Sequence, residues 1–155
     1  MVPRLAGHKR LVGPLLLVVA ATGLWAALAR HPLWHTDLWG HLAYGRLISR
    51  SGRLPVAEPF LPFSSDAPLV DTAWLSQLAG YSLFRLGGPA LLQWTYALLV
   101  TAAAAAVLVP AVRRGDRLLP RLAAAGVFLA VGWQQLAIVR PQLVGLACFA
   151  GLLAL

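Results

Sequence analysis

Long apolar runs, separated by shorter segments that hold the charged residues, dominate the pattern of this chain. Residues 11–29, 89–109 and 122–139 contain no Asp, Glu, Lys or Arg. Because an α-helix rises about 1.5 Å per residue, runs of this length reach roughly 27 to 32 Å, which is enough to cross the hydrocarbon core of a bilayer. The pattern therefore predicts three membrane-spanning helices.

A fourth apolar run, residues 143–155, would reach only roughly 20 Å as a helix, which is too short to span. We therefore expect residues 1–155 to be the N-terminal part of a single membrane domain in a longer protein. The first run also has features of a signal peptide, since Ala27-Leu28-Ala29 resembles a cleavage site. Its apolar stretch is longer than usual and more spans follow, so an uncleaved anchor is the better interpretation.

The long segment between the first two spans, residues 30–88, predicts two short helices. The first runs from Asp37 to about Arg50, with Thr36 as its N-cap and Gly52 as its stop. At about 100° per residue this helix has two distinct faces. One carries Asp37, His41, Tyr44 and Ile48, and the other carries Trp39, Arg46 and Arg50. Such a helix could lie along the membrane surface, with its arginines near lipid headgroups and its Asp and His directed at the protein.

The second helix is predicted from Thr72 to Leu86, with Asp71 or Thr72 as its cap and the Gly87-Gly88 pair at its end. Its length is typical of an interfacial or re-entrant segment rather than of a span. The predicted fold class is therefore all-α, with polytopic transmembrane helices and an extracytoplasmic loop, residues 30–88, that bears one or two interfacial helices.

Composition supports a membrane protein and excludes two other classes. With 59% hydrophobic residues and a mean hydropathy of +0.73, the chain has too little polar surface to cover a soluble globule. The net charge of +8 comes from short basic clusters between apolar runs rather than from one basic face, so nucleic acid is excluded as a partner. Cys148 is the only cysteine, which excludes a disulfide framework and a thiolate metal cluster.

The distribution of basic residues predicts the orientation in the membrane. Three Lys or Arg residues and no acid precede the first span, and residues 113–121 hold four arginines against Asp116. Both segments are therefore expected in the cytoplasm. Residues 30–88 hold five arginines balanced by four acids, so this loop is expected on the extracytoplasmic side of the inner (plasma) membrane.

Five polar residues are candidates for chemistry, and each has a simpler alternative. Asp37 could only stabilise a helix N-terminus, and Asp71 could only cap a helix. His41 could ligate a metal with Asp37, but two ligands without a third make a weak site. Glu58 could be an ordinary solvated acid. Arg140 could extend to the membrane interface, or its planar fork could bind an anionic headgroup or a lipid-linked phosphate.

The outer loop also contains a series of short motifs. They are Asp37-Leu38-Trp39-Gly40-His41 with Gly45, Gly52-Arg53-Leu54-Pro55, Glu58-Pro59-Phe60, Trp74-Leu75 and Leu86-Gly87-Gly88, and Arg140-Pro141-Gln142 follows later. Together they resemble a group of bacterial multi-spanning proteins similar to the GT-C membrane glycosyltransferases, which include the dolichyl-phosphate-mannose type. Glu58 stands where the group has Asp, and Gln77 stands where an acid often follows Trp-Leu.

This resemblance implies a glycosyltransferase that uses a polyprenyl-phosphate sugar donor on the extracytoplasmic face, with that donor and membrane lipid as partners. Asp37 would be its catalytic base. The expected substrate-binding residues are His41, Glu58, Asp71, Arg140 and Gln142. A divalent cation stays open as a cofactor. The alternative is a non-enzymatic transporter or lipid-binding scaffold, but the spans lack the ionisable residues that ion-coupled transporters usually carry near the midplane.

Overall fold

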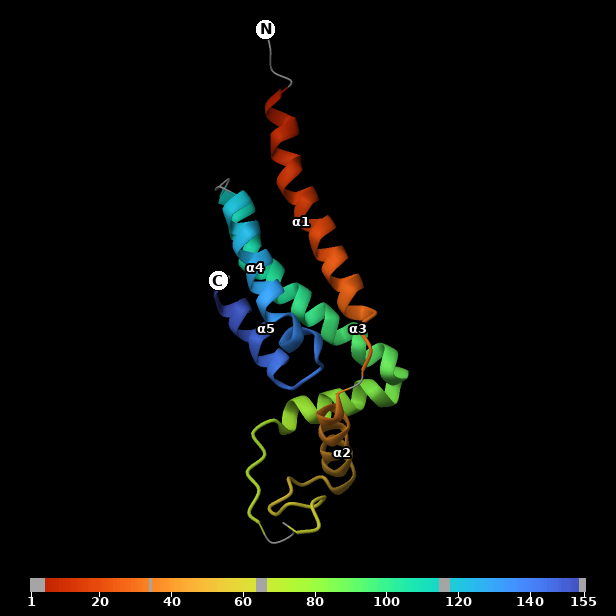
Figure 1. The fold of residues 1–155 in the computed structure, drawn as a ribbon. Helices are drawn as coiled ribbons and strands as arrows, with labels where there is room; N and C mark the ends of the chain where they lie inside the picture. Colours follow the sequence, from red (N-terminus) through yellow and green to blue (C-terminus); the bar gives the residue numbers. More distant parts are fainter. Residues whose placement is uncertain (1–4, 34, 64–66, 115–117, 154–155) are drawn as a thin grey trace.

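The computed structural model describes residues 5–33, 35–63, 67–114 and 118–153, and over these residues the chain is all-helical (Figure 1). The helices are α1 (Leu5–Ala29), α2 (Thr36–Ser51), α3 (Trp74–Arg114), α4 (Leu118–Ala137) and α5 (Gln142–Leu153). In the loop between α2 and α3, an isolated antiparallel bridge joins Ala57 to Pro68. The predicted all-α class is therefore confirmed.

Two of these helices are long and apolar enough to cross a membrane, judged by length and composition. The qualifying segments are residues 12–29 of α1 and 74–109 of α3, and shorter apolar stretches cover residues 122–137 and 142–153. Two helix ends differ slightly from the ends of the apolar runs. α4 ends at Ala137, because the ring of Pro141 would clash with the carbonyl group of residue 137 if the helix continued. α3 continues through Pro110 to Arg114.

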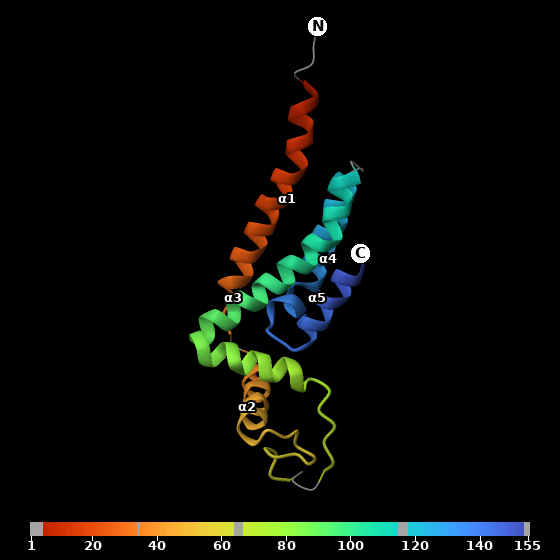
Figure 2. The same ribbon diagram turned by 180° about the vertical axis from the view of Figure 1, so that it is seen from behind.

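A pair of glycines divides α3 into two parts. Gly87 (φ −146°, ψ 19°) and Gly88 (φ 65°, ψ −160°) leave helical geometry, and the positive φ of Gly88 is one that other residues rarely adopt. The predicted helix end at this pair is confirmed, although the chain becomes helical again at once. We call residues 74–86 the crossing segment, because it lies across the end of the bundle in both views, and residues 89–114 the long segment (Figures 1 and 2).

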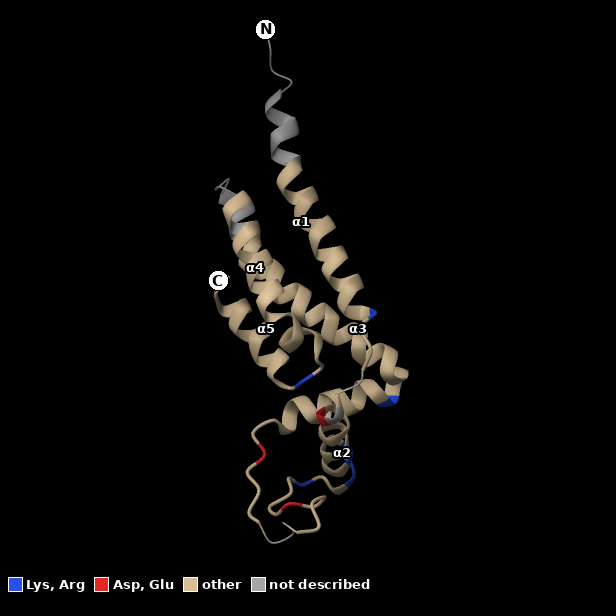
Figure 3. Cartoon of the chain, viewed as in Figure 1, with Lys and Arg blue, Asp and Glu red and all other residues tan. Residues whose placement is uncertain are grey.

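The charged loop lies at one end of the molecule. α2 and the loop that follows it are at the end opposite to the start of α1 (Figures 1 and 2). The start of α1, the end of α3 and the start of α4 all point toward the other end (Figures 1 and 2). The described Asp, Glu, Lys and Arg residues lie toward the α2 end of the chain (Figure 3). The helix ends next to the two basic segments, residues 1–10 and 113–121, therefore lie at the opposite end of the molecule from the predicted outer loop, residues 30–88.

The hydrophobic core lies where the helix ends converge beside α2. Its buried residues are Leu28, Leu38, Leu42, Leu92, Tyr96, Ala97, Val100, Leu136, Ala137, Val139 and Leu143. Two side-chain hydrogen bonds connect α1 to α3 just after the glycine pair. Gln93 Nε2 donates to the carbonyl oxygen of Leu28, and Trp25 Nε1 donates to that of Trp94 at 3.4 Å. The first turn of α2 therefore rests on a packed junction of four other helices.

The start of α2 differs from the prediction, whereas its end agrees. His35 is the N-cap, with extended backbone angles (φ −79°, ψ 127°) and its Nδ1 3.4 Å from the backbone N of Asp37. The predicted cap, Thr36, is already the first helical residue. A ring nitrogen one residue earlier occupies the place usually taken by a hydroxyl or carboxylate oxygen. At the C-terminus, Gly52 has φ 66° and its N–H donates to the carbonyl oxygen of Ile48 at 2.9 Å.

Candidate functional site

α2 and the crossing segment approach each other closely at Gly45. A Cβ atom on Gly45 would lie 2.2 Å from the carbonyl oxygen of Gln77 and 2.8 Å from Tyr81 Cβ, so only glycine permits this contact. Asp37, His41 and Gly45 follow one another at four-residue intervals and so share one face of the helix. The crossing at Gly45 therefore brings this face, with His41, against α3.

Asp37, in the first turn of α2, meets Arg140 from the turn between α4 and α5. Arg140 Nη2 lies 3.4 Å from Asp37 Oδ2 and 2.9 Å from His35 Nε2. Arg140 Nη1 donates to Gln135 Oε1 at 3.4 Å. The Asp37 side chain is 53% exposed and that of Arg140 is 28% exposed. The carboxylate is thus held by a guanidinium and remains accessible from outside.

His35 connects the two charged groups. Because a guanidinium only donates hydrogen bonds, His35 Nε2 must accept from Arg140, and the neutral ring then carries its proton on Nδ1. Nδ1 lies 3.5 Å from Asp37 Oδ2. A protonated Nδ1 favours this carboxylate over the backbone N–H of Asp37 as its partner. In this tautomer His35 orients the Asp37 carboxylate, and its Nδ1 no longer accepts from the backbone N–H of Asp37.

His41, one turn further along α2, is held by Gln77 of α3. Gln77 Nε2 donates to Asp71 Oδ1 at 3.2 Å and lies 3.3 Å from His41 Nδ1. Since a carboxylate only accepts, the amide nitrogen must face Asp71, and the same NH₂ group donates to His41. The neutral ring of His41 then carries its proton on Nε2, where it can donate to a ligand. Asp71 Oδ1 also accepts from the backbone N of Ala73, in its predicted place as a cap before α3.

The surroundings of His41 favour its neutral form. Burial lowers the pKa of His41 below its ordinary value of 6.5, because the imidazolium loses solvation. The carboxylates of Asp37 and Asp71 act in the opposite direction, and the guanidinium of Arg140 lowers the pKa further. The pKa stays lowered, so His41 at neutral pH is a hydrogen-bonding group rather than a fixed cation.

A small cavity of about 10 Å³ lies beside His41, Gln77 and Arg140, with room for roughly one water molecule. Three buried polar atoms in this region make no hydrogen bond to another described residue. They are Asp71 Oδ2, Gln77 Oε1 and Arg140 Nε. Since buried polar atoms are nearly always paired, these atoms mark where a water molecule or a polar ligand group would be bound.

Glu58 belongs to a different contact. Its carboxylate accepts from the Tyr44 hydroxyl and, at 2.9 Å, from the backbone N of Phe60. Burial, together with this carboxylate, raises the pKa of Tyr44 to about 12, and the hydrogen bond from Tyr44 lowers the pKa of Glu58. Tyr44 lies about two helical turns beyond Asp37. Glu58 therefore fixes the outer loop to α2 and is not placed beside Asp37.

The structure groups four of the six predicted site residues and leaves two outside. We use the name polar cluster for His35, Asp37, His41, Asp71, Gln77 and Arg140. Glu58 holds the loop, and Gln142 is exposed at the first residue of α5. His35 and Gln77 were not predicted as site residues. The sequence could have indicated His35 by its position two residues before Asp37. For Gln77 the only indication was that a polar side chain occurs in an apolar helix.

The described residues do not form a site for a metal ion. Among them, no group of three or more His, Cys, Asp or Glu side chains is arranged to hold a metal ion. Asp37, the acid proposed as a metal ligand together with His41, is paired with the guanidinium of Arg140. The chemistry open to the polar cluster is therefore proton transfer at Asp37 and anion binding at Arg140.

Comparison of the chain with protein-family models, with curated protein sequences and with solved structures gives no match. The function must therefore be inferred from the residues of the polar cluster and from their position at the end of an apolar helical bundle.

Proposed function

We propose that this protein is an integral-membrane glycosyltransferase of GT-C type that takes a sugar from a polyprenyl-phosphate donor on the extracytoplasmic face. The observation that carries the proposal is the meeting of Asp37 and Arg140. A carboxylate able to accept a proton and a guanidinium able to bind phosphate lie 3.4 Å apart, although they come from distant parts of the chain. The motif resemblance to GT-C enzymes suggests Asp37 as the base and Arg140 as a substrate-binding residue.

The position of the polar cluster supports a lipid-linked donor. Arg140 follows the end of α4, and Asp37 follows the end of α1, so both residues lie where apolar helices stop. The phosphate of a polyprenyl-linked sugar lies at headgroup depth, and an apolar helix ends at the same depth when it spans the bilayer. We infer that Arg140 and the donor phosphate meet at this level, with loop 30–88 outside and the N-terminus in the cytoplasm.

The proposed reaction requires one base and one anion-binding group. The acceptor hydroxyl gives its proton to the Asp37 carboxylate while its oxygen forms a bond to the anomeric carbon of the sugar. The bond between that carbon and the phosphate oxygen breaks, and its electron pair leaves with polyprenyl phosphate. The guanidinium of Arg140 balances the negative charge that develops on this leaving group.

The remaining residues of the polar cluster position these groups. His35 orients the Asp37 carboxylate, and the Nε2–H of His41 is available to hydrogen-bond a sugar or acceptor oxygen. Gln77 and Asp71 hold His41 in this tautomer. In this proposal Asp37 is the catalytic residue, Arg140 and His41 bind substrate, and the other three are positioning residues.

The test uses the full chain in membranes and follows release of polyprenyl phosphate from polyprenyl-phosphate-mannose, the donor that the resemblance suggests. Asp37→Asn keeps the size of the side chain and removes the base, so we expect transfer to fall by about 10² to 10⁴ while donor binding persists. Arg140→Gln should weaken donor binding itself. Arg85→Gln, an exposed arginine outside the polar cluster, is the control and should behave like the wild type.

Two outcomes would contradict the proposal. If Asp37→Asn transferred sugar at the wild-type rate, Asp37 would not be the base. If the wild type released no polyprenyl phosphate, and Asp37→Asn changed only its thermal stability, the Asp37–Arg140 ion pair would serve to brace helices in a non-enzymatic membrane protein.

A further inference from the structure

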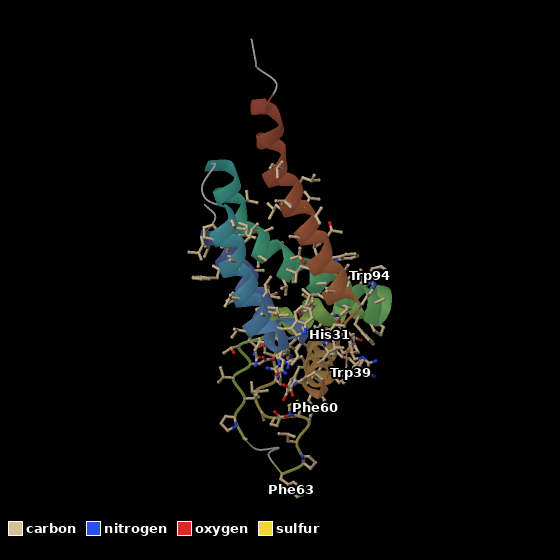
Figure 4. All side chains as sticks on the ribbon, turned by 45° about the horizontal axis from the view of Figure 1, so that its top comes forward. His31, Trp39, Phe60, Phe63 and Trp94 are labelled. Carbon is tan, nitrogen blue, oxygen red and sulfur yellow. The ribbon has the colours of Figure 1, made fainter. Side chains whose placement is uncertain are left out.

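The second face of α2 forms an apolar groove with the crossing segment. The groove has a volume of about 430 Å³, which lies within the range of about 300 to 1,000 Å³ that is usual for ligand sites. Residues that line it include Trp39, Leu47, Phe60, Phe84, Arg46 and Arg50. Figure 4 shows the Trp39 side chain beside α2 and that of Phe60 on the outer loop. The groove is therefore walled by two helices and one loop.

The two arginines give this apolar groove a positive edge. Arg46 and Arg50 are one helical turn apart, so they lie on the same side of α2. Both are exposed, and neither forms an ion pair with an acid in the described ranges of the chain. Apolar walls beside two free guanidinium groups are complementary to a molecule with an apolar chain and an anionic head.

We propose that this groove binds one anionic phospholipid, with an acyl chain against Trp39 and Phe84 and its phosphate between Arg46 and Arg50. Trp39 is 47% exposed, and its ring meets that of Phe84 edge to face with 6.1 Å between centroids. An exposed tryptophan beside arginines is typical of the level at which headgroups and acyl chains meet. The proposal relies on the membrane location but not on glycosyl transfer.

The occupant of the groove is distinct from the proposed sugar donor. Asp37 and His41 lie on the opposite face of α2 from Trp39, Arg46 and Arg50. A lipid whose phosphate is held by Arg46 and Arg50 therefore cannot present that phosphate to Asp37. It would instead link α2 to the crossing segment and to the loop at Phe60, and it would stabilise the outer end of the protein by binding only the folded state.

The experiment measures lipid binding to the purified full chain in detergent by quenching of tryptophan fluorescence. The probes are phosphatidylglycerol and phosphatidylcholine with brominated acyl chains, and Trp39→Phe identifies the part of the quenching that comes from the groove. We expect phosphatidylglycerol to bind more tightly than phosphatidylcholine. Each arginine near a lipid headgroup contributes about five-fold, so Arg46→Gln with Arg50→Gln should weaken phosphatidylglycerol binding roughly 25-fold. The matched control, Arg85→Gln, should leave binding unchanged.

Three results would overturn the proposal. The first is equal binding of the two phospholipids, and the second is unchanged binding of phosphatidylglycerol to the double arginine variant. The third is displacement of phosphatidylglycerol from the groove by polyprenyl monophosphate, which would identify the groove as a donor site. Ala43→Trp fills the groove without removing charge, and it should abolish the Trp39-dependent quenching by both lipids.

Discussion

The helix crossing at Gly45 allows a sharp test, because two glycines of the same helix should respond to alanine in opposite ways. Alanine is favoured over glycine inside a helix by about 0.5 to 1 kcal/mol. At Gly40 a new Cβ atom would meet nothing within 4 Å, so Gly40→Ala should gain most of this amount. Gly45→Ala has the same intrinsic gain, but it places the methyl group inside the contact with α3.

The cost at Gly45 follows from the distances. The new carbon would lie 2.2 Å from the carbonyl oxygen of Gln77 and 2.7 Å from its carbonyl carbon, and ordinary contacts begin at 3.4 Å. Both atoms belong to the backbone, so no change of rotamer relieves the overlap, and the helices must separate by about 1 Å. Overpacking of this kind costs about 1 to 3 kcal/mol, which exceeds the gain in helix propensity. The separation would also break the hydrogen bond from Gln77 to His41, which is already 3.3 Å long.

The assay is thermal unfolding in detergent, followed by tryptophan fluorescence, for the wild type and both variants. We expect Gly40→Ala to unfold at or above the wild-type temperature and Gly45→Ala to unfold below it. Equal stability of the two alanine variants would refute the reasoning, because α2 and the crossing segment would then not be in contact at Gly45. A proton titration of His41 by NMR offers a second readout, since separation of the helices should reduce the burial that lowers its pKa in Gly45→Ala but not in Gly40→Ala.

Three further predictions follow from individual side chains. The pKa of His41 is lower in the folded chain than in the unfolded chain, so the unfolded chain binds more protons below about pH 6.5. The free energy of unfolding should therefore decrease as the pH drops through this value, and it should decrease less in His41→Gln. Unfolding measured at several pH values tests this. Titration of tyrosinate absorbance should show a component with a pKa of about 12 that is absent in Tyr44→Phe, and the stability that Tyr44 contributes should be lost above pH 10. Leu92→Ala should lower the free energy of unfolding by about 2 to 5 kcal/mol, whereas Leu98→Ala should change it by less than about 0.5 kcal/mol, because the two leucines are 1% and 59% exposed.

The sequence was sufficient for the parts of the fold that depend on local periodicity. The helical repeat separated His41 and Ile48 from Trp39 and Arg46. The structure buries Ile48, half-buries His41, and exposes Trp39 and Arg46. The stop at Gly52 and the break at Gly88 were also predictable, because both glycines adopt a positive φ that few other residues tolerate. Each of these features is decided within a few residues of the chain.

Contacts between segments that are distant in the sequence could not be predicted from local patterns. No spacing rule connects Asp37 with Arg140, and the resemblance alone suggested that both belong to one site. Gln77 was treated as the neutral replacement of an acid, yet the structure buries it between His41 and Asp71, where its amide donates to both. The outer-loop acid Glu58 was expected to share the site, but its contact with Tyr44 depends on how the loop folds back onto α2.

The crossing at Gly45 gives a physical reason for the spacing of Asp37, His41 and Gly45. Glycine at the third position lets the backbone of α3 approach, and this approach brings Gln77 within reach of His41 one turn earlier. Asp37, another turn earlier, is half-exposed, and its carboxylate lies 3.4 Å from Nη2 of Arg140. A larger residue at position 45 would therefore disturb His41 through Gln77 without touching His41 itself. The acid and the histidine are four residues apart because one helix face must carry both the site and the contact that assembles it.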